Sequence, residues 1–316
     1  MKGIENMEKE QELLKPKIDV VFHSLFRKGN ERITKALITS IINEKIEKVE
    51  LDKDRYVVGE YPEEKLGIVD MKAELDNGTI CDIEIQLSDN KDTAERFLYY
   101  WSRIYSGQLV KGKKYSNLNK VIGIIIIDYN FEKTKEIERM STKWKIKEVT
   151  TGKEIELTDM LELYIIEISK VKRALEKNPE DKLAQWIQFL DNPNEKMVLE
   201  KVMEKNEEIK EAMEDLERLS KIKKLRRIAE LKEKAIRDEE NGLRHAKEDG
   251  INIGLEKGKK LGLEQGKKLG LEEGRAIGEK SKQLEIARNL LQEGMSIEKV
   301  STIVGLTKEE IEKIEK

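Results

Sequence analysis

The sequence predicts an α/β sandwich built on a mixed sheet, followed by a long all-helical C-terminal extension. Three observations lead to this fold class. Residues 69–87 hold two segments in which apolar and polar residues alternate, the period of a half-buried hairpin. Residues 121–127 (VIGIIII) form a nearly continuous β-branched run, typical of a strand buried on both faces of a sheet. After Pro193 the chain contains no proline and favours helix to its end.

Composition indicates a compact part and an elongated, solvated part. Of the 316 residues, 40% are charged, 38% are apolar and 5% are aromatic, which is too little apolar material for one uniform globule. The net charge of −3 gives no general attraction to nucleic acid, so nucleic-acid contacts would need local basic patches. The single cysteine, Cys81, excludes an intrachain disulfide. The polar N-terminus and the lack of a long apolar run predict a cytoplasmic protein with no membrane partner.

Two helices and a further strand complete the α/β pattern. Residues 31–43 and 94–109 carry apolar side chains at helical spacing. Residues 161–168 (LELYIIEI) form a second candidate for a buried strand. The apolar positions are Ile33, Leu37, Ile38, Ile41 and Ile42 in the first helix, and Ala94, Phe97, Leu98, Trp101, Ile104, Tyr105 and Leu109 in the second. The order of helix, hairpin, helix and buried strand is typical of a mixed-sheet sandwich.

The hairpin register follows from the positions of its apolar residues. A two-residue loop, Asn77-Gly78, would place the apolar residues of the two strands on opposite faces, because a one-residue slip turns every side chain over. A three-residue loop, residues 76–78, keeps them on one face and gives Gly78 the left-handed position after a type I turn. This register sets Asp70 directly opposite Glu84. The other expected pairs are Val69–Ile85, Met71–Ile83, Ala73–Cys81 and Lys72–Asp82.

The opposition of Asp70 and Glu84 has two interpretations. Directly opposed side chains have Cβ atoms about 4.5–5.5 Å apart, a separation at which like charges destabilise a sheet. A divalent cation such as Mg²⁺, which binds oxygen ligands from one or two carboxylates, would relieve this repulsion. The alternative is a solvent-exposed face on which the repulsion is weak. The hairpin alone leaves both interpretations open.

Short motifs stand in a fixed order along most of the chain. They are Lys17-Ile18-Asp19-x-x-Phe22-His23-x-Leu25-Phe26, Gly67-Ile68-Val69-Asp70, Asp82-Ile83-Glu84-Ile85-Gln86, Glu95-Arg96-x-x-Tyr99-Tyr100-Trp101-x-Arg103-x-Tyr105 and a glycine-repeat tail. Together they resemble the Rpn family of recombination-promoting nucleases and transposases, in the PD-(D/E)xK nuclease superfamily. The resemblance implies a restriction-endonuclease-like fold and Mg²⁺- or Mn²⁺-dependent hydrolysis of DNA phosphodiester bonds. Asp70 and Glu84 would be the metal ligands, and Asp70, Glu84 and Gln86 the catalytic residues.

Gln86 departs from the pattern of the superfamily, in which most members have a lysine at this position. A neutral amide orients water or phosphate through hydrogen bonds, but it carries no charge and cannot act as a general base. Catalysis would therefore depend on the metal and on charge neutralisation by other groups. His23 also stands where relatives often have a lysine.

Further residues are candidates for the same site. Asp19 is either a third carboxylate or a cap of the first helix. The basic loop residues Lys111, Lys113 and Lys114 follow the second helix, and we expect them near the site as phosphate-binding groups.

Arg96, Tyr100 and Arg103 lie close to one face of the second helix, at positions i, i+4 and i+7. They would either contact the scissile phosphate or serve the fold. In the second case Tyr100 is part of the core, and Arg96 pairs with Asp92 or Glu84.

The tail is expected to consist of distinct parts. The expected divisions are a nuclease core at 1–175, a charged helical and possible coiled-coil region at 176–249, a glycine repeat at 250–280 and a small helical element at 281–316. Glycines recur at every fourth residue from Gly250 to Gly278. Each costs about 1 kcal/mol relative to alanine in a helix, so the repeat is either a helix-pairing, oligomerising module or a flexible linker. Residues 295–310 resemble a helix–turn–helix, with Ser296 and the Thr307/Glu310 pair as caps, and would contact DNA or protein.

The sequence therefore predicts a Mg²⁺-dependent DNA endonuclease, associated with recombination, transposition or defence, that forms homo-oligomers through its C-terminal helices. The alternative is a catalytically inactive DNA-binding or assembly factor that keeps the nuclease fold.

Overall fold

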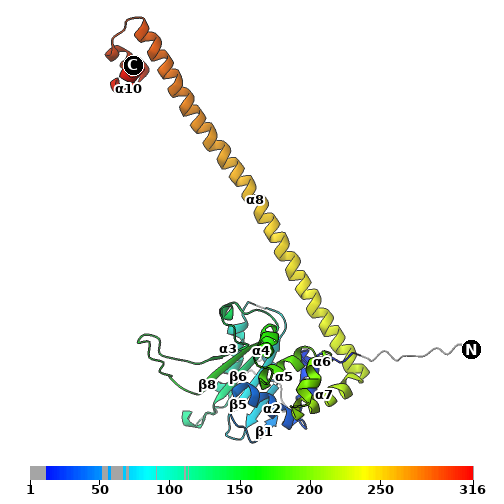
Figure 1. Ribbon diagram of the computed structural model, residues 1–316. Coiled ribbons are helices and arrows are strands. Elements are labelled where there is room, and N and C mark those ends of the chain that lie inside the picture. The colour runs from blue at the N-terminus through cyan, green and yellow to red at the C-terminus, as the bar shows by residue number, and fades with distance from the viewer. Residues whose placement is uncertain are drawn as a thin grey trace, which may run out of the picture. The chain divides into compact units, whose positions relative to one another are not determined.

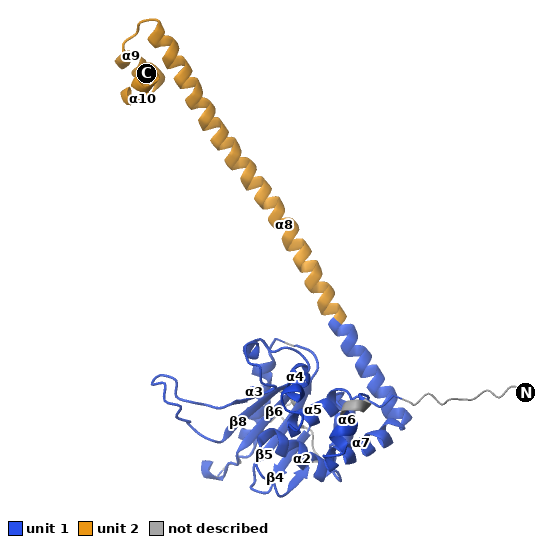
Figure 2. Ribbon diagram, in the orientation of Figure 1, with its two compact units in different colours: residues 1–240 blue, residues 241–316 orange. Residues whose placement is uncertain are grey.

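The computed structural model describes residues 12–51, 56–57, 67–68, 71–89, 91–109, 112 and 114–315. The chain divides into two compact units, residues 1–240 and 241–316 (Figure 2). Four of the residues singled out above, Val69, Asp70, Lys111 and Lys113, lie outside the described residues.

The first unit is built on a six-stranded mixed sheet with strand order β1-β4-β5-β6-β8-β7 (Figure 1). The neighbours β5/β6 and β6/β8 are parallel, and β1/β4, β4/β5 and β7/β8 are antiparallel. The strands are β1 (Val49–Leu51), β4 (Met71–Leu75), β5 (Ile80–Gln86), β6 (Val121–Ile127), β7 (Ser141–Trp144) and β8 (Leu161–Glu167), with β2 (Tyr56–Val57) and β3 (Gly67–Ile68) paired separately. The expected mixed-sheet α/β class with a long helical extension is confirmed.

Helices precede, interrupt and follow this sheet. They are α1 (Asp19–Leu25), α2 (Glu31–Ile42), α3 (Thr93–Gly107), α4 (Val171–Lys177), α5 (Lys182–Asp191), α6 (Lys196–Met203), α7 (Glu207–Ser220) and α8 (Lys223–Gln292), with short 3₁₀ turns η1 (Tyr115–Asn117), η2 (Glu132–Thr134) and η3 (Ile168–Lys170). The two helices and the two buried strands expected from the sequence are present, with ends that differ by no more than two residues.

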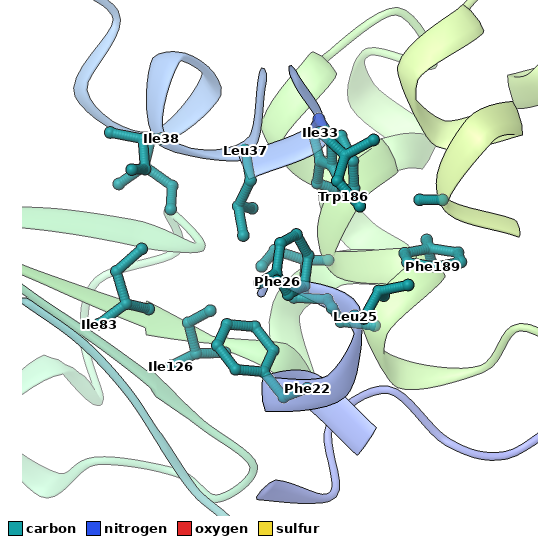
Figure 3. Close-up of a cluster of buried hydrophobic side chains, with 14 of the residues drawn as sticks. Phe22, Leu25, Phe26, Ile33, Leu37, Ile38, Ile83, Ile126, Trp186 and Phe189 are labelled. Atoms are coloured by element: carbon teal, nitrogen blue, oxygen red, sulfur yellow. The ribbon is translucent and has the colours of Figure 1, made fainter. Parts of the chain in front are cut away.

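The main core lies between one face of the sheet and helices from both ends of the first unit. Phe22 of α1 packs against Phe26, the residue that follows the helix, with ring centroids 4.6 Å apart, and Phe26 packs against Trp186 of α5 with centroids 6.2 Å apart. Figure 3 shows these rings beside Ile83 of β5 and Ile126 of β6. Since α5 and α7 contribute buried residues to the same core, the sheet and the helices that follow it form one packed unit.

The opposite face of the sheet is covered by α3. At Gly123 of β6 a Cβ atom would lie 2.9 Å from Cζ of Phe97, so only glycine allows the helix this close. Trp101 Nε1 donates to the carbonyl of Val121 at 2.9 Å, which fixes the helix near the start of β6. Leu98, expected on the buried stripe, is 48% exposed, whereas Phe97, Trp101 and Ile104 turn toward the sheet.

The hairpin has the register that the three-residue loop predicts. Met71 pairs with Ile83, Lys72 with Asp82 and Ala73 with Cys81, and Gly78 has a φ of +80°. The described ladder ends at Met71 and Ile83, two steps before the expected pair of residues 69 and 85.

The second unit contains the C-terminal part of α8, α9 (Ile297–Val304) and α10 (Lys308–Glu315). The last turns of α8 and the two short helices enclose a small core of Ala287, Val300, Val304, Leu306 and Ile311. Gly305 turns the chain with a φ of +71°, and Thr307 and Glu310 form the expected reciprocal capping box. Ser296 occupies the N-cap position of α9 without a side-chain capping bond.

The glycine repeat lies within α8. A Cβ atom placed on any glycine from Gly250 to Gly278 would meet no described atom within 4 Å, apart from the neighbouring backbone. Large apolar side chains on the same stretch, such as Leu255 and Leu263, are more than 70% exposed. None of the helices in the described part of the chain has the length and apolarity needed to cross a membrane.

Candidate active site

The polar face of β5 is buried beneath α3. Asp82, Glu84 and Gln86 alternate with residues of the main core, and they are 0%, 3% and 7% exposed. Asp82 is the neighbour of Gly123 in the parallel β5/β6 ladder, so both residues face α3. The interpretation of a solvent-exposed acidic face is therefore wrong at Glu84.

Arg96 of α3 is held at the end of this polar row. With the amide of Gln86 oriented so that its oxygen faces the guanidinium, both terminal nitrogens of Arg96 donate to it at 3.2 Å. The guanidinium also lies over the ring of Tyr100, 5.5 Å from its centroid. The structure therefore brings three of the expected site residues into contact, and the partner of Arg96 is Gln86, which was not among the two partners considered from the sequence.

Tyr100 and Arg103 follow Arg96 on the same face of α3, so this face runs along β5 from its end toward its beginning. Both side chains are half-buried. The carboxylates and the amide of β5 thus lie beneath the helix that carries these two guanidiniums and the phenol, and the Arg96 guanidinium contacts Gln86 at the end of the row.

The structure does not test the pairing of Asp70 with Glu84. The ladder places Met71 opposite Ile83, and one more antiparallel step would bring residue 70 opposite residue 84. Because Asp70 lies outside the described residues, this pair remains a prediction.

Asp19 is the first residue of α1. One carboxylate oxygen accepts from the backbone nitrogen of Val20 at 2.7 Å, and the other pairs with Lys232 of α8 at 2.8 Å. Neither contact involves β5, and the carboxylate is 41% exposed. His23, one turn further along α1, is half-buried.

Lys114 lies at the far end of the sheet from Gln86. The segment between α3 and β6 is closed by Gln108, whose side-chain amide exchanges hydrogen bonds with the backbone of Asn119 at 2.8 and 3.1 Å. Asn119 also packs against Gly78 in the hairpin turn. Since α3 runs back along the parallel strands, Lys114 is at the start of β5, and the structure does not bring it to the Arg96 end.

Other polar groups gather at the carboxyl ends of β5 and β6. The ammonium of Lys17 binds Asp128 and Asp191, each at 2.7 Å. Burial lowers the pKa of Lys17, but hydrogen bonds to the two carboxylates outweigh this, so that its pKa is raised overall. Lys17 belongs to a motif that the sequence analysis names. Its two carboxylate partners come from distant segments, so no local pattern in the sequence predicts them.

Tyr129 joins α3 to the end of β6 through a 2.6 Å hydrogen bond between its hydroxyl and that of Thr93. Burial raises the pKa of this tyrosine. The contact fixes the first turn of α3, from which Arg96 projects.

The donors of β5 fit a hard cation, because carboxylate oxygens are the ligands that Mg²⁺ prefers. Within the described ranges, no group of three or more His, Cys, Asp or Glu side chains is close enough to hold a metal ion. Asp70, the other ligand that the sequence predicts, lies outside those ranges, so its part in a metal centre remains a prediction.

Comparison with protein families identifies the class of protein. Residues 16–246 match the model of the PD-(D/E)XK nuclease family transposases, and residues 280–316 match the C-terminal helix–turn–helix domain of the Rpn/YhgA-like nuclease family. No curated protein and no solved structure gives a significant match. The fold and the matched range assign the first unit to the PD-(D/E)XK nucleases. The chain belongs to the transposase family of that class, as the resemblance implied, and it carries the helix–turn–helix of the Rpn-type nucleases.

Proposed function

We propose that this chain is a Mg²⁺-dependent DNA endonuclease, with Mn²⁺ as an alternative ion, whose metal ligands are Asp70 and Glu84. The observation that carries the proposal is the burial of Glu84 on the α3 side of β5, one ladder step beyond the Met71–Ile83 pair. Membership of a nuclease family that generally uses divalent metals supports the same reaction.

Burial and register together favour a cation. A carboxylate that leaves water loses hydration, and a positive charge offsets the cost. A cation between Asp70 and Glu84 would also neutralise the repulsion of two directly opposed acids. The metal, when bound, would polarise the phosphodiester and lower the pKa of a water nucleophile.

The residues of the chain would orient the DNA around this centre. The phosphate would be held next to Glu84 by the amide of Gln86. Three side chains of α3 would hold it as well, namely Arg96, Tyr100 and Arg103. The helix–turn–helix of the second unit, residues 280–316, would bind duplex DNA.

We also propose that the four parts expected from the sequence have separate roles, with residues 250–280 pairing copies of the chain. Leu255, Leu263 and the neighbouring glycines are open on the isolated helix, and glycines spaced by four allow two helices to approach closely. Two active sites in one assembly would match the two strands of DNA. Sedimentation of the full chain and of a Gly258→Glu/Gly266→Glu variant tests this, since a bulky charge on the glycine row would return an oligomer to monomer.

Plasmid nicking tests the nuclease reaction. Wild-type protein with Mg²⁺ should convert supercoiled plasmid to open circle, whereas EDTA, Asp70→Ala and Glu84→Gln should each abolish conversion. Glu74→Gln is the matched control, because this exposed acid lies on the same hairpin and should leave the rate unchanged. If wild type and Glu84→Gln nick at the same rate, the assignment of Glu84 is wrong.

The second candidate function is a DNA-binding or assembly factor without catalysis. Gln86 favours it, because the position that usually carries a lysine has no charge here, and the helix–turn–helix match is compatible with binding alone. DNA that shifts in a gel but stays intact with Mg²⁺ and with Mn²⁺ would support this alternative against the nuclease.

A further inference from the structure

We propose that Arg96 supplies the positive charge that nucleases of this class usually take from a lysine at the position of Gln86, and that Gln86 positions Arg96. The inference rests on the proposed nuclease function and adds the residue that neutralises the phosphate. This proposal explains two observations together: residue 86 is a neutral glutamine, and the cation Arg96 is in direct contact with it.

The contact between Arg96 and Gln86 uses two donors and one acceptor, which fixes the orientation of the guanidinium. Both terminal nitrogens of Arg96 reach the one amide oxygen of Gln86 at 3.2 Å, and Gln86 is itself 7% exposed and held in the β5 ladder. The ring of Tyr100, 5.5 Å away, supports the guanidinium from α3. A guanidinium has five N–H donors, so three remain for an anion after the two that bind the amide.

The guanidinium also lies at a suitable distance from the acidic centre. Glu84 and Gln86 are two residues apart on one face of a strand, which separates them by about 6.6 Å along β5. A phosphate oxygen approaching a cation at Glu84 would therefore place its other oxygens toward the end of the strand, where Arg96 is held. Arginine matches the geometry of a phosphate with paired donors, as lysine does not.

An arginine in this role changes the pH dependence of the reaction. An arginine side chain remains charged over the whole range in which the protein is assayed and cannot take a proton from water. A lysine in the same place titrates near 10.4, or lower if it is buried. The charge on Arg96 thus neutralises and positions the phosphate without transferring protons.

Moving the charge from position 96 to position 86 tests the proposal. The variants are Arg96→Gln, which removes it, and Gln86→Lys/Arg96→Gln, which places a cation at the usual lysine position. Arg173→Gln is the matched control, because Arg173 is a 55% exposed arginine whose partner is Glu138. Thermal unfolding of each full-length variant shows whether the fold is retained.

The first readout is steady-state nicking with Mg²⁺ between pH 6 and pH 11. Arg96→Gln should lower kcat by about 100-fold, the effect of removing one preorganised donor to the transition state. The double variant should recover at least tenfold of that loss and lose activity above the lysine pKa, whereas wild type should show no such alkaline fall. Arg173→Gln should match wild type.

The second readout needs no cleavage. In EDTA, the slope of log K for a short duplex against log salt concentration should fall by about 0.9 in Arg96→Gln and return in the double variant. Equal slopes and equal kcat in Arg96→Gln and Arg173→Gln would overturn the inference, as would a double variant that folds but is no better than Arg96→Gln. If wild type does not nick DNA, the proposed function fails, and the slope alone decides whether Arg96 binds phosphate.

Discussion

Replacement of Glu162 should lower the stability of the first unit in a way that depends on pH. It lies on β8 with its side chain 3% exposed, and it binds Lys120 at 3.0 Å, Lys143 at 2.9 Å and Lys145 at 3.1 Å. The hydroxyl of Tyr164 adds a hydrogen bond at 3.3 Å. In Glu162→Gln the three ammonium groups would lose the charge that they share.

The size of the effect follows from the pKa of Glu162. Burial raises this pKa, but hydrogen bonds from Lys143, Lys120 and Lys145 outweigh burial and hold it at about 2, against 4.5 for an unperturbed side chain. A difference of this size corresponds to about 3 kcal/mol between the folded and unfolded chains. Since Lys143 is 38% exposed, screening reduces the gain, and we expect a loss of about 1–2 kcal/mol at pH 7 and low salt.

The sign of the pH dependence is fixed by the lowered pKa. A carboxyl group that is more acidic in the folded state contributes its full stability above its unfolded pKa, near 4.5, and loses it as the pH falls toward 2. The difference between wild type and Glu162→Gln should thus be full at pH 7, smaller at pH 4 and close to zero at pH 2.

Urea unfolding followed by tryptophan fluorescence measures this difference in the first unit alone, because Trp101, Trp144 and Trp186 all lie within it. Glu156→Gln, at a more exposed partner of Lys145, is the control and should change stability by less than about 0.5 kcal/mol. A loss in Glu162→Gln that is the same at pH 7 and pH 2, or that does not shrink in 0.5 M salt, would show that the lysines do not hold the charge as described.

Two further predictions concern packing and capping. Gly123→Ala should destabilise the first unit by about 1–3 kcal/mol in urea, because its Cβ would lie 2.9 Å from Phe97, whereas Gly266→Ala, in open space on α8, should increase helical content instead. Stability equal to wild type in Gly123→Ala would mean that α3 moves away without cost. Thr307→Ala should lower the helix content of the full chain measured by circular dichroism on heating, because it removes a capping box worth about 1 kcal/mol. Glu310→Ala, which removes the other partner of the box, should have the same effect.

The hairpin could be predicted in detail because its rules are local. The period of two assigned each residue of β4 and β5 to a face, and Gly78 selected the loop length that kept the apolar residues together. The β-branched run of β6 likewise needed no partner to be recognised as a strand. The capping box of α10 follows from a spacing of three between Thr307 and Glu310.

The surroundings of the site could not be predicted, because they depend on contacts between distant segments. Glu162 draws its lysines from two separate stretches, Lys120 before β6 and Lys143 and Lys145 at β7, and no spacing marks them as partners. The pair of Gln86 and Arg96 joins a strand to the next helix, and its geometry depends on how closely α3 approaches Gly123. The helices that complete the main core, α5 and α7, carry ordinary amphipathic patterns that do not say which sheet they cover.

The polar face of β5 shows why the alternation of apolar and polar residues could not decide whether Glu84 is exposed or buried. An alternating strand has one apolar and one polar face, and the pattern is the same whether the polar face meets water or a helix that carries guanidiniums. Burial distinguishes the two cases, because an acidic row that is less than 10% exposed needs positive charge close by, from side chains or from a bound ion. Helix α3 brings Arg96 to the end of that row, and one further step of the ladder, if it continued, would set residue 70 opposite Glu84 at its middle. In the function that we propose, the protein charge at the end of the strand would bind the phosphate, and a metal ion held by Asp70 and Glu84 would supply the activation of water.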